Sequence, residues 1–100
     1  MDEFEIEFEW DDEKALKNMA KHGVAFEEAL TVFADPNSLT IHDDEHSTED
    51  EERYWTIGTS YRQRLLLVVH CDRDEKVRLI SARVAPKRER EKYEKGIFGT

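Results

Sequence analysis

The run Leu65–Val69, with the sequence LLLVV, constrains the fold more than any other part of the chain. Five successive apolar residues offer no polar side to water, so a strand here must be covered on both faces and lie inside a sheet. Strand-like runs flank it at 53–60 (RYWTIGTS) and 76–84 (KVRLISARV), and the links between the three are short. Because short links join antiparallel neighbours, the sequence predicts an antiparallel sheet with this strand inside it.

The N-terminal half predicts one strand and two helices. FEIEFEW (4–10) alternates apolar and acidic residues with the period of a strand. Asp11 or Asp12 is a good N-cap for a helix that runs to about Lys21 and ends at Gly23. The apolar stripe of this helix is expected at Ala15, Leu16, Met19 and Ala20.

The remaining elements follow from turn and helix signals. FEEALTVF (26–33) has helical spacing, Asp35-Pro36-Asn37 ends it, and LTI (39–41) is a short strand. Pro86 begins a polar helix, KREREKYEK, that Gly96 ends. The predicted order is β-α-α-β-β-β-β-α, which makes the fold class α+β: a small antiparallel sheet with helices packed on it, in one domain spanning residues 1–100.

Composition narrows the class of protein. No run approaches the roughly 18–20 apolar residues of a membrane span, and the acidic N-terminus does not look like a signal peptide. Cys71 is the only cysteine, so an internal disulfide or a cysteine metal cluster is not expected. A cytoplasmic protein without a membrane partner is therefore predicted.

Charge is unevenly distributed along the chain. Residues 1–52 hold eighteen Asp and Glu against three lysines, a balance of −15, whereas residues 53–100 carry +6 and the whole chain −9. Such asymmetry indicates an anionic ligand for the basic part and a basic partner for the acidic part, with the first strand and the 43–52 loop as landing sites. The simpler alternative is that the two halves pair with each other in the folded state.

Several segments together carry a resemblance to a known family. They are FEWDDEKALKNMAKHGVAFEEALTVFADP, HSTEDEERYWTIG, RLLLVVH and VRLISARVAPKREREKYE, in this order between about Phe8 and Tyr93. The most specific parts are the FEWD…K…N…KHG block, the HS..EER run and the ISAR…ER..YE ending. In these segments the chain resembles the BrnT toxins of type II toxin–antitoxin systems.

The resemblance implies a RelE-like fold and ribonuclease activity that needs no metal or other cofactor. It also implies a hetero-oligomer with a BrnA-type antitoxin whose ribbon-helix-helix domain binds DNA, so that this chain would reach DNA only through its partner. A different class remains open, namely a catalytically inactive scaffold that only binds such a partner. The net charge of −9 departs from the basic surface usual for RNA-binding proteins and requires a local cationic patch.

Arginines are the leading catalytic candidates because guanidinium binds phosphate oxygens in a bidentate way. Arg83 and Arg64 lie on strand-like segments, and Arg78 is a further candidate for RNA binding. The alternative for Arg83 is a strand-end arginine that reaches solvent or a carboxylate. Arg83 is expected on the face of its strand that holds Val77, Leu79 and Ser81. His70 shares a face with Arg64 but lies roughly 20 Å along the strand, so the two are not expected to act together.

Other candidates come from the family segments, and each has a structural alternative. Lys14, Lys21 and His22 are a possible catalytic and RNA-binding cluster with Asn18, or an exposed face in which His22 complements a helix C-terminus. His46, Glu52 and Arg53 belong either to the active site or to an ordered loop; their carboxylates lack metal-ligand spacing, so no metal is predicted. The remaining candidates for RNA binding are Arg90, Tyr93 and Trp10. Arg90 and Tyr93 either contact RNA or attach the last helix to the sheet. Trp10 either stacks on a base or packs in the core.

Overall fold

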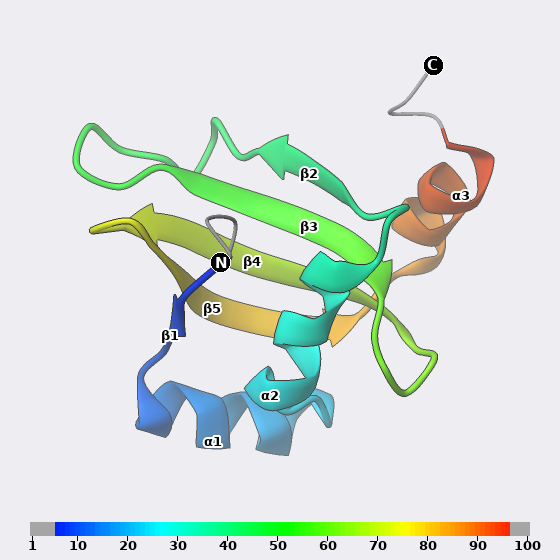
Figure 1. Ribbon diagram of the computed structural model, residues 1–100, viewed down its shortest axis with the longest axis horizontal. Coiled ribbons are helices and arrows are strands. Elements are labelled where there is room, and N and C mark those ends of the chain that lie inside the picture. Colours follow the sequence, from blue (N-terminus) through cyan, green and yellow to red (C-terminus); the bar gives the residue numbers. More distant parts are fainter. Residues whose placement is uncertain (1–5, 97–100) are drawn as a thin grey trace, which may run out of the picture.

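The computed structural model describes residues 6–96 (Figure 1). Its elements are β1 (Phe8–Glu9), α1 (Asp12–His22), α2 (Phe26–Ala29), the 3₁₀ helix η1 (Leu30–Ala34), β2 (Leu39–His42), β3 (Arg53–Thr59), β4 (Leu65–Arg73), β5 (Lys76–Val84) and α3 (Lys87–Lys95). The predicted α+β class and element order are confirmed. Within the described range, no helix is both long enough and apolar enough to cross a bilayer.

The sheet has the strand order β1-β5-β4-β3-β2, and β4 lies at its centre as the LLLVV run predicts. Strands β2 to β5 pair antiparallel, but β1 pairs parallel to β5 through Phe8 opposite Val77. The sheet is therefore mixed rather than wholly antiparallel. No tight hairpin links β1 to its neighbour, so its direction is not constrained by a short turn. Part of the predicted strand 4–10, residues 4 and 5, lies outside the described residues.

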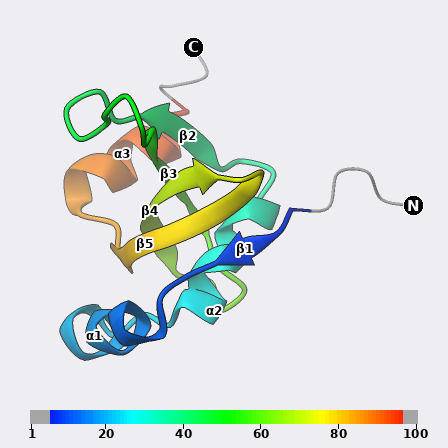
Figure 2. The same ribbon diagram turned by 90° about the vertical axis from the view of Figure 1, so that its left-hand side faces the viewer.

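Two apolar clusters cover opposite faces of the sheet. On one face, α1, α2 and η1 enclose Val24, Phe26, Leu66, Val68 and Leu79. On the other, which we call the α3 face, α3 packs at one end against a smaller cluster (Figures 1 and 2). The smaller cluster consists of Ile57, Leu65, Leu67 and Ala85, with Trp55 and Tyr93 beside it.

A β-bulge in β5 changes which residues share a face. Val69 pairs with Ser81 and His70 pairs with Leu79, so Ile80 is an extra residue on the β5 side. Because one inserted residue reverses the alternation beyond it, Leu79 and Ala82 both enter the larger core, whereas Ser81 and Arg83 point to the α3 face. The expected face shared by Arg83 with Val77 and Leu79 is therefore wrong.

The helix ends of α1 follow the sequence signals, but its buried side does not. The Asp11 side chain accepts hydrogen bonds from the backbone N–H groups of Glu13 and Lys14, and Gly23 ends the helix at φ 69°. Asn18 is the buried residue of α1, while Leu16 is 72% exposed and Met19 47% exposed. The expected apolar stripe is thus wrong at Leu16, Met19 and Ala20, because the Asn18 side chain takes the inward position, whereas Ala15 packs against the larger core as expected.

Candidate functional site

Asn18 attaches α1 to the edge of β5. Its Nδ2 donates to the carbonyl oxygens of Ala82 (2.8 Å) and Val24 (2.9 Å), and its Oδ1 accepts from the N–H of Ala82 (3.0 Å). β1 pairs only with Val77 and Arg78, so the edge of β5 beyond them needs another partner. The Asn18 amide supplies one and holds the helix beside the bulge.

This attachment creates a small cationic cavity. A space of about 200 Å³ lies between α1 and the bulge and is bordered by Ile80 and Ser81. Three of the predicted site residues, Lys14, Lys21 and His22, line it together. Lys17 also lines it and was not selected from the sequence, although lysines at 14, 17 and 21 have the spacing of one helix flank. We call this the lysine cavity.

Three predicted arginines share the α3 face of the sheet. Strand register places Arg53 on β3 and Arg78 on β5 opposite the same residue, Cys71, and Arg83 lies opposite Leu67. The Arg53 guanidinium is bound to Glu51 at 3.0 Å, and Arg78 lies 3.7 Å from Glu9. Arg83 is exposed and has no ion pair or hydrogen bond with the side chains of residues 6–96.

The Arg83 guanidinium is thus available to a ligand. It stands two positions after Ser81, which borders the lysine cavity, and on the same face of β5. Two residues of a strand span roughly 7 Å, within reach of the long lysine and arginine side chains. The bulge and the Asn18 contacts therefore place Arg83 two residues from the border of the lysine cavity.

Arg64 is not part of this group. Its Nε donates to Oε2 of Glu28 at 2.9 Å, its Nη2 contacts the other carboxylate oxygen, and the same nitrogen donates to the Gly23 carbonyl at 3.2 Å. The Glu28 side chain is only 3% exposed and also accepts from the Ser60 hydroxyl. Hydrogen bonds from Arg64 hold the pKa of Glu28 below its usual range. In the structure Arg64 is the ion-pair partner of the buried Glu28.

The 43–52 loop is ordered by its own side chains. The Ser47 hydroxyl donates to the Asp43 carbonyl at 2.7 Å and accepts from the N–H of Arg53 at 2.8 Å. The His46 ring is hydrogen-bonded to the Asp43 carboxylate, and the His42 ring to the Glu52 carboxylate. His42 was not among the candidates from the sequence. The hydrogen bond that the His42 ring donates to the Glu52 carboxylate raises the pKa of His42. His46 therefore has its partner within the loop and Glu52 has its partner at the end of β2. No group of three or more metal ligands forms within residues 6–96.

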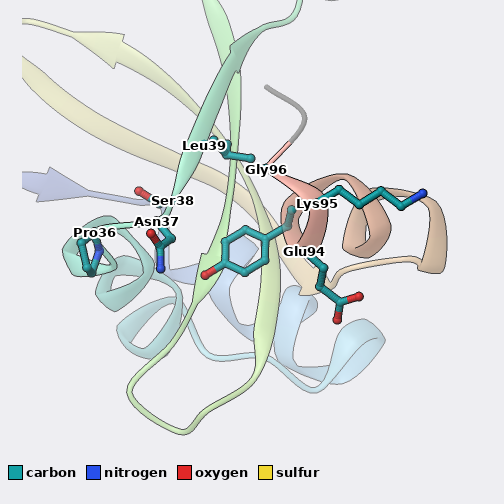
Figure 3. A pocket seen from close by; sticks show the side chains of 8 residues that line it. Pro36, Asn37, Ser38, Leu39, Glu94, Lys95 and Gly96 are labelled. Carbon is teal, nitrogen blue, oxygen red and sulfur yellow. The ribbon is translucent and has the colours of Figure 1, made fainter. Parts of the chain in front are cut away.

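Of the three remaining candidates, Tyr93 and Trp10 make structural contacts within the fold. The Tyr93 hydroxyl donates to Asp35 Oδ2 at 2.6 Å and fastens α3 to the turn after η1, beside a groove of about 530 Å³ lined by 36–39 and 93–96 (Figure 3). Trp10 packs edge-on against Phe26 in the larger core. Arg90 is half-buried and has no polar side-chain partner in the described range.

His70 is a buried residue of the larger core face. Its Nε2 shares a 2.8 Å hydrogen bond with the Thr56 hydroxyl, and its ring packs against Phe33 and Tyr54. Burial lowers the pKa of His70 to about 4. His70 does not line the lysine cavity, and it lies on the opposite face of the sheet from Arg83.

Comparisons with known proteins agree with this architecture. Residues 10–89 match the family model described as ribonuclease toxin, BrnT, of type II toxin–antitoxin system. The structure of the Brucella abortus ribonuclease toxin BrnT superposes with a TM-score of 0.62 over 83% of this chain and 100% of that one, at 21% sequence identity. No curated protein is similar enough in sequence to count as a match. Because the family model covers most of its length, the chain belongs to the BrnT family of ribonuclease toxins of type II toxin–antitoxin systems.

Proposed function

We propose that this toxin is an endoribonuclease that cleaves RNA without a metal ion, and that a BrnA-type antitoxin with a ribbon-helix-helix domain neutralises it. One observation carries the proposal: Arg83, which is exposed, lies two positions after Ser81 on the same face of β5, and Ser81 borders the lysine cavity. A chain with net charge −9 repels polyanions, so a local group of uncompensated cations is what binding RNA requires.

The proposed chemistry needs three functions at one phosphodiester. A base takes the proton of the 2′-hydroxyl, the 2′-oxygen attacks phosphorus, and an acid gives a proton to the departing 5′-oxygen, which leaves a 2′,3′-cyclic phosphate. The five-coordinate phosphorus carries extra negative charge, which a bidentate guanidinium stabilises. We assign this task to Arg83, and proton transfer to the group formed by Lys14, Lys21 and His22.

The other two arginines of the α3 face, Arg78 and Arg53, would contact RNA away from the cleaved phosphate or only after a change of partner. Arg78 lies five residues before Arg83, roughly 16 Å along the strand, so it would contact a different phosphate from Arg83. Arg53 shares its guanidinium with Glu51 and would have to exchange that partner to bind RNA. Arg64, His46 and Glu52 have no place in this proposal because the structure pairs each of them within the framework.

The test uses the purified chain without antitoxin. Incubated with RNA, it should produce discrete 5′-hydroxyl ends at equal rates with and without EDTA. Arg83→Ala should lower the rate about 100-fold or more, because one preorganised donor to the developing charge is lost. Arg73→Ala, an exposed arginine at the far end of β4, is the matched control and should cleave like the wild type.

Three results would count against the proposal. Intact RNA under both conditions would remove catalysis and leave a partner-binding scaffold, whose gene could be cloned freely without the antitoxin. Cleavage abolished by EDTA would remove metal independence. A wild-type rate for folded Arg83→Ala would remove Arg83 from the site.

A further inference from the structure

Helix α3 covers only one end of the α3 face. Ile57 and Leu67, in the cluster against which α3 packs, are 1% and 5% exposed. The next row across the four strands is half-buried at every position, and it consists of Ile41, Trp55, Val69 and Ser81. The cover therefore ends between these two rows, and the second row faces outward.

Trp55 is the large aromatic residue of this open row. Its ring packs beside the smaller cluster. Within residues 6–96 its indole N–H has no hydrogen-bond partner and its ring contacts no other aromatic ring, whereas Trp10 packs edge-on against Phe26 in the larger core. A buried tryptophan usually has a partner for its N–H. Trp55 is thus held at the cluster but presents part of its ring outward.

The charge around this ring is positive. In the two rows beside Trp55, the charged residues that strands β2–β5 supply are all arginines, namely Arg53, Arg78 and Arg83. Helix α3 adds five Lys and Arg against three Glu. Glu51 and Glu9 are ion-paired with Arg53 and Arg78, and Asp50 lies at that same end of the sheet. Arg83 has no such partner in the described range, so the uncompensated charge lies toward β5.

Position connects Trp55 to the proposed cleavage site. Ser81 stands in the same row, two strands away, and borders the lysine cavity, while Arg83 stands in the next row. Neighbouring strands are about 4.8 Å apart, so the backbones of Trp55 and Ser81 are separated by roughly 10 Å. A base on Trp55 would thus belong to the same RNA segment whose phosphate Arg83 binds.

An aromatic ring beside arginines suits bases that are not paired. Single-stranded RNA is bound by stacking its bases on aromatic rings while basic groups hold its phosphates. A base inside a duplex is already stacked on both sides and offers no face to a tryptophan. An acidic protein segment would also use the arginines, but the continuity of this row with the proposed cleavage site favours RNA.

We propose that Trp55 stacks on a base of the substrate, and that this substrate is single-stranded RNA. The inference rests on the proposed function and deepens it by naming the class of RNA. The indole ring positions the strand, and Arg83 and the lysine cavity act on a phosphate beside the stacked base.

Tryptophan fluorescence tests the contact, because a base stacked on an indole quenches its emission. Trp10 and Trp55 are the two tryptophans of the chain. In purified Trp10→Phe, where Trp55 alone emits, a single-stranded RNA with 2′-O-methyl groups should quench the emission, and a duplex of the same sequence should not. In Trp55→Phe, where Trp10 alone emits, the single strand should leave the emission unchanged.

Affinity separates stacking from a structural role. Trp55→Ala should bind the single strand about tenfold or more weakly with an unchanged salt dependence, because a stacking contact is lost and no phosphate contact is. An oligonucleotide with the same backbone but no bases should bind Trp55→Ala and the wild type alike. The matched control is Tyr61→Ala: Tyr61 is 69% exposed in the β3–β4 turn, and this variant should bind like the wild type.

Each contrary result has a distinct meaning. Wild-type affinity of folded Trp55→Ala, or unquenched Trp55 emission with RNA bound, would overturn the stacking contact and leave the nuclease proposal standing. Equal binding of duplex and single strand would overturn the substrate class. Quenching without cleavage would remove catalysis alone, whereas a wild-type chain that binds no RNA would overturn both proposals. Because the fluorescence measurement keeps Trp55 in place, it does not depend on the folding of Trp55→Ala.

Discussion

The side-chain amide of Asn18 hydrogen-bonds both backbone polar groups of Ala82, 64 residues away, and so takes the place of a neighbouring strand at the edge of β5. The contact is buried, and Asn18 itself is 6% exposed. It sets the position of α1 relative to the β5 bulge, and thereby the distance between the helix lysines and the strand that carries Arg83. A structural amide thus determines the geometry of the candidate site.

Replacing Asn18 with Ala should destabilise the fold by about 2–3 kcal/mol, because the N–H and carbonyl of Ala82 and the carbonyl of Val24 would lose a buried partner. Urea unfolding measures the change. Lys17→Ala, one position earlier on the exposed surface, is the control and should stay within about 0.5 kcal/mol of the wild type. Equal stability of the two variants would show that water replaces the amide at little cost.

Replacing Arg64 with Met should cost about 3–5 kcal/mol, because Glu28 would remain as a buried charge without its main partner. Arg64→Lys should retain part of this stability. The control is Arg62→Met: Arg62 lies 3.8 Å from the same carboxylate but is 59% exposed, so its loss should cost less than about 1 kcal/mol. A folded Arg64→Met chain of wild-type stability that no longer cleaves RNA would return Arg64 to the active site.

Stability should fall as pH decreases between about 6.5 and 4 because of His70. The folded chain holds the pKa of His70 at about 4 by burial, whereas the unfolded chain takes up the proton near pH 6.5. Protonation therefore favours unfolding in this window, by up to about 3 kcal/mol at its lower end. Unfolding free energies measured across the window should show the slope, and His70→Leu should flatten it; Thr56 keeps Thr40 as a partner in that variant.

At lower pH a second group contributes. Arg64 holds the pKa of Glu28 below its usual range, so the stability from this carboxylate is present above the ordinary glutamate pKa and is lost as pH falls below about 4. This loss should persist in His70→Leu. A His70→Leu profile with an unchanged slope above pH 4 would show that the histidine is not the group responsible.

The lysine cavity should be visible in the salt dependence of RNA binding. If Lys14 and Lys21 contact phosphates, Lys14→Ala/Lys21→Ala should lower the slope of log K against log salt by about 0.7 for each lysine. A single-stranded RNA with 2′-O-methyl groups allows binding to be measured without cleavage. Lys76→Ala, at the first residue of β5, serves as the control. An unchanged slope in the double variant would place the RNA elsewhere.

Several local features of the site were predictable. The Asp11 cap, the Gly23 end and the lysine spacing depend on residues within one or two turns, so the sequence indicates α1 and its basic flank. The alternatives left open for Tyr93 and the Ser47 loop needed the structure. Tyr93 binds Asp35, 58 positions away, and Ser47 joins two backbone segments whose approach no local pattern encodes.

The sequence by itself determined the element order, the central place of β4 and the ends of α1 and α3, because these depend on periodicity and on short-range backbone chemistry. The helix expected over 26–33 is instead the short α2 followed by the 3₁₀ helix η1. Only the tertiary structure decided which charged groups are free. The extra residue Ile80 turned Arg83 to the other face of β5. The Arg64 guanidinium is bound by Glu28, which lies 36 positions away in the sequence. Register and pairing between distant segments depend on packing in three dimensions, where a one-residue shift reverses a strand's faces without changing its composition.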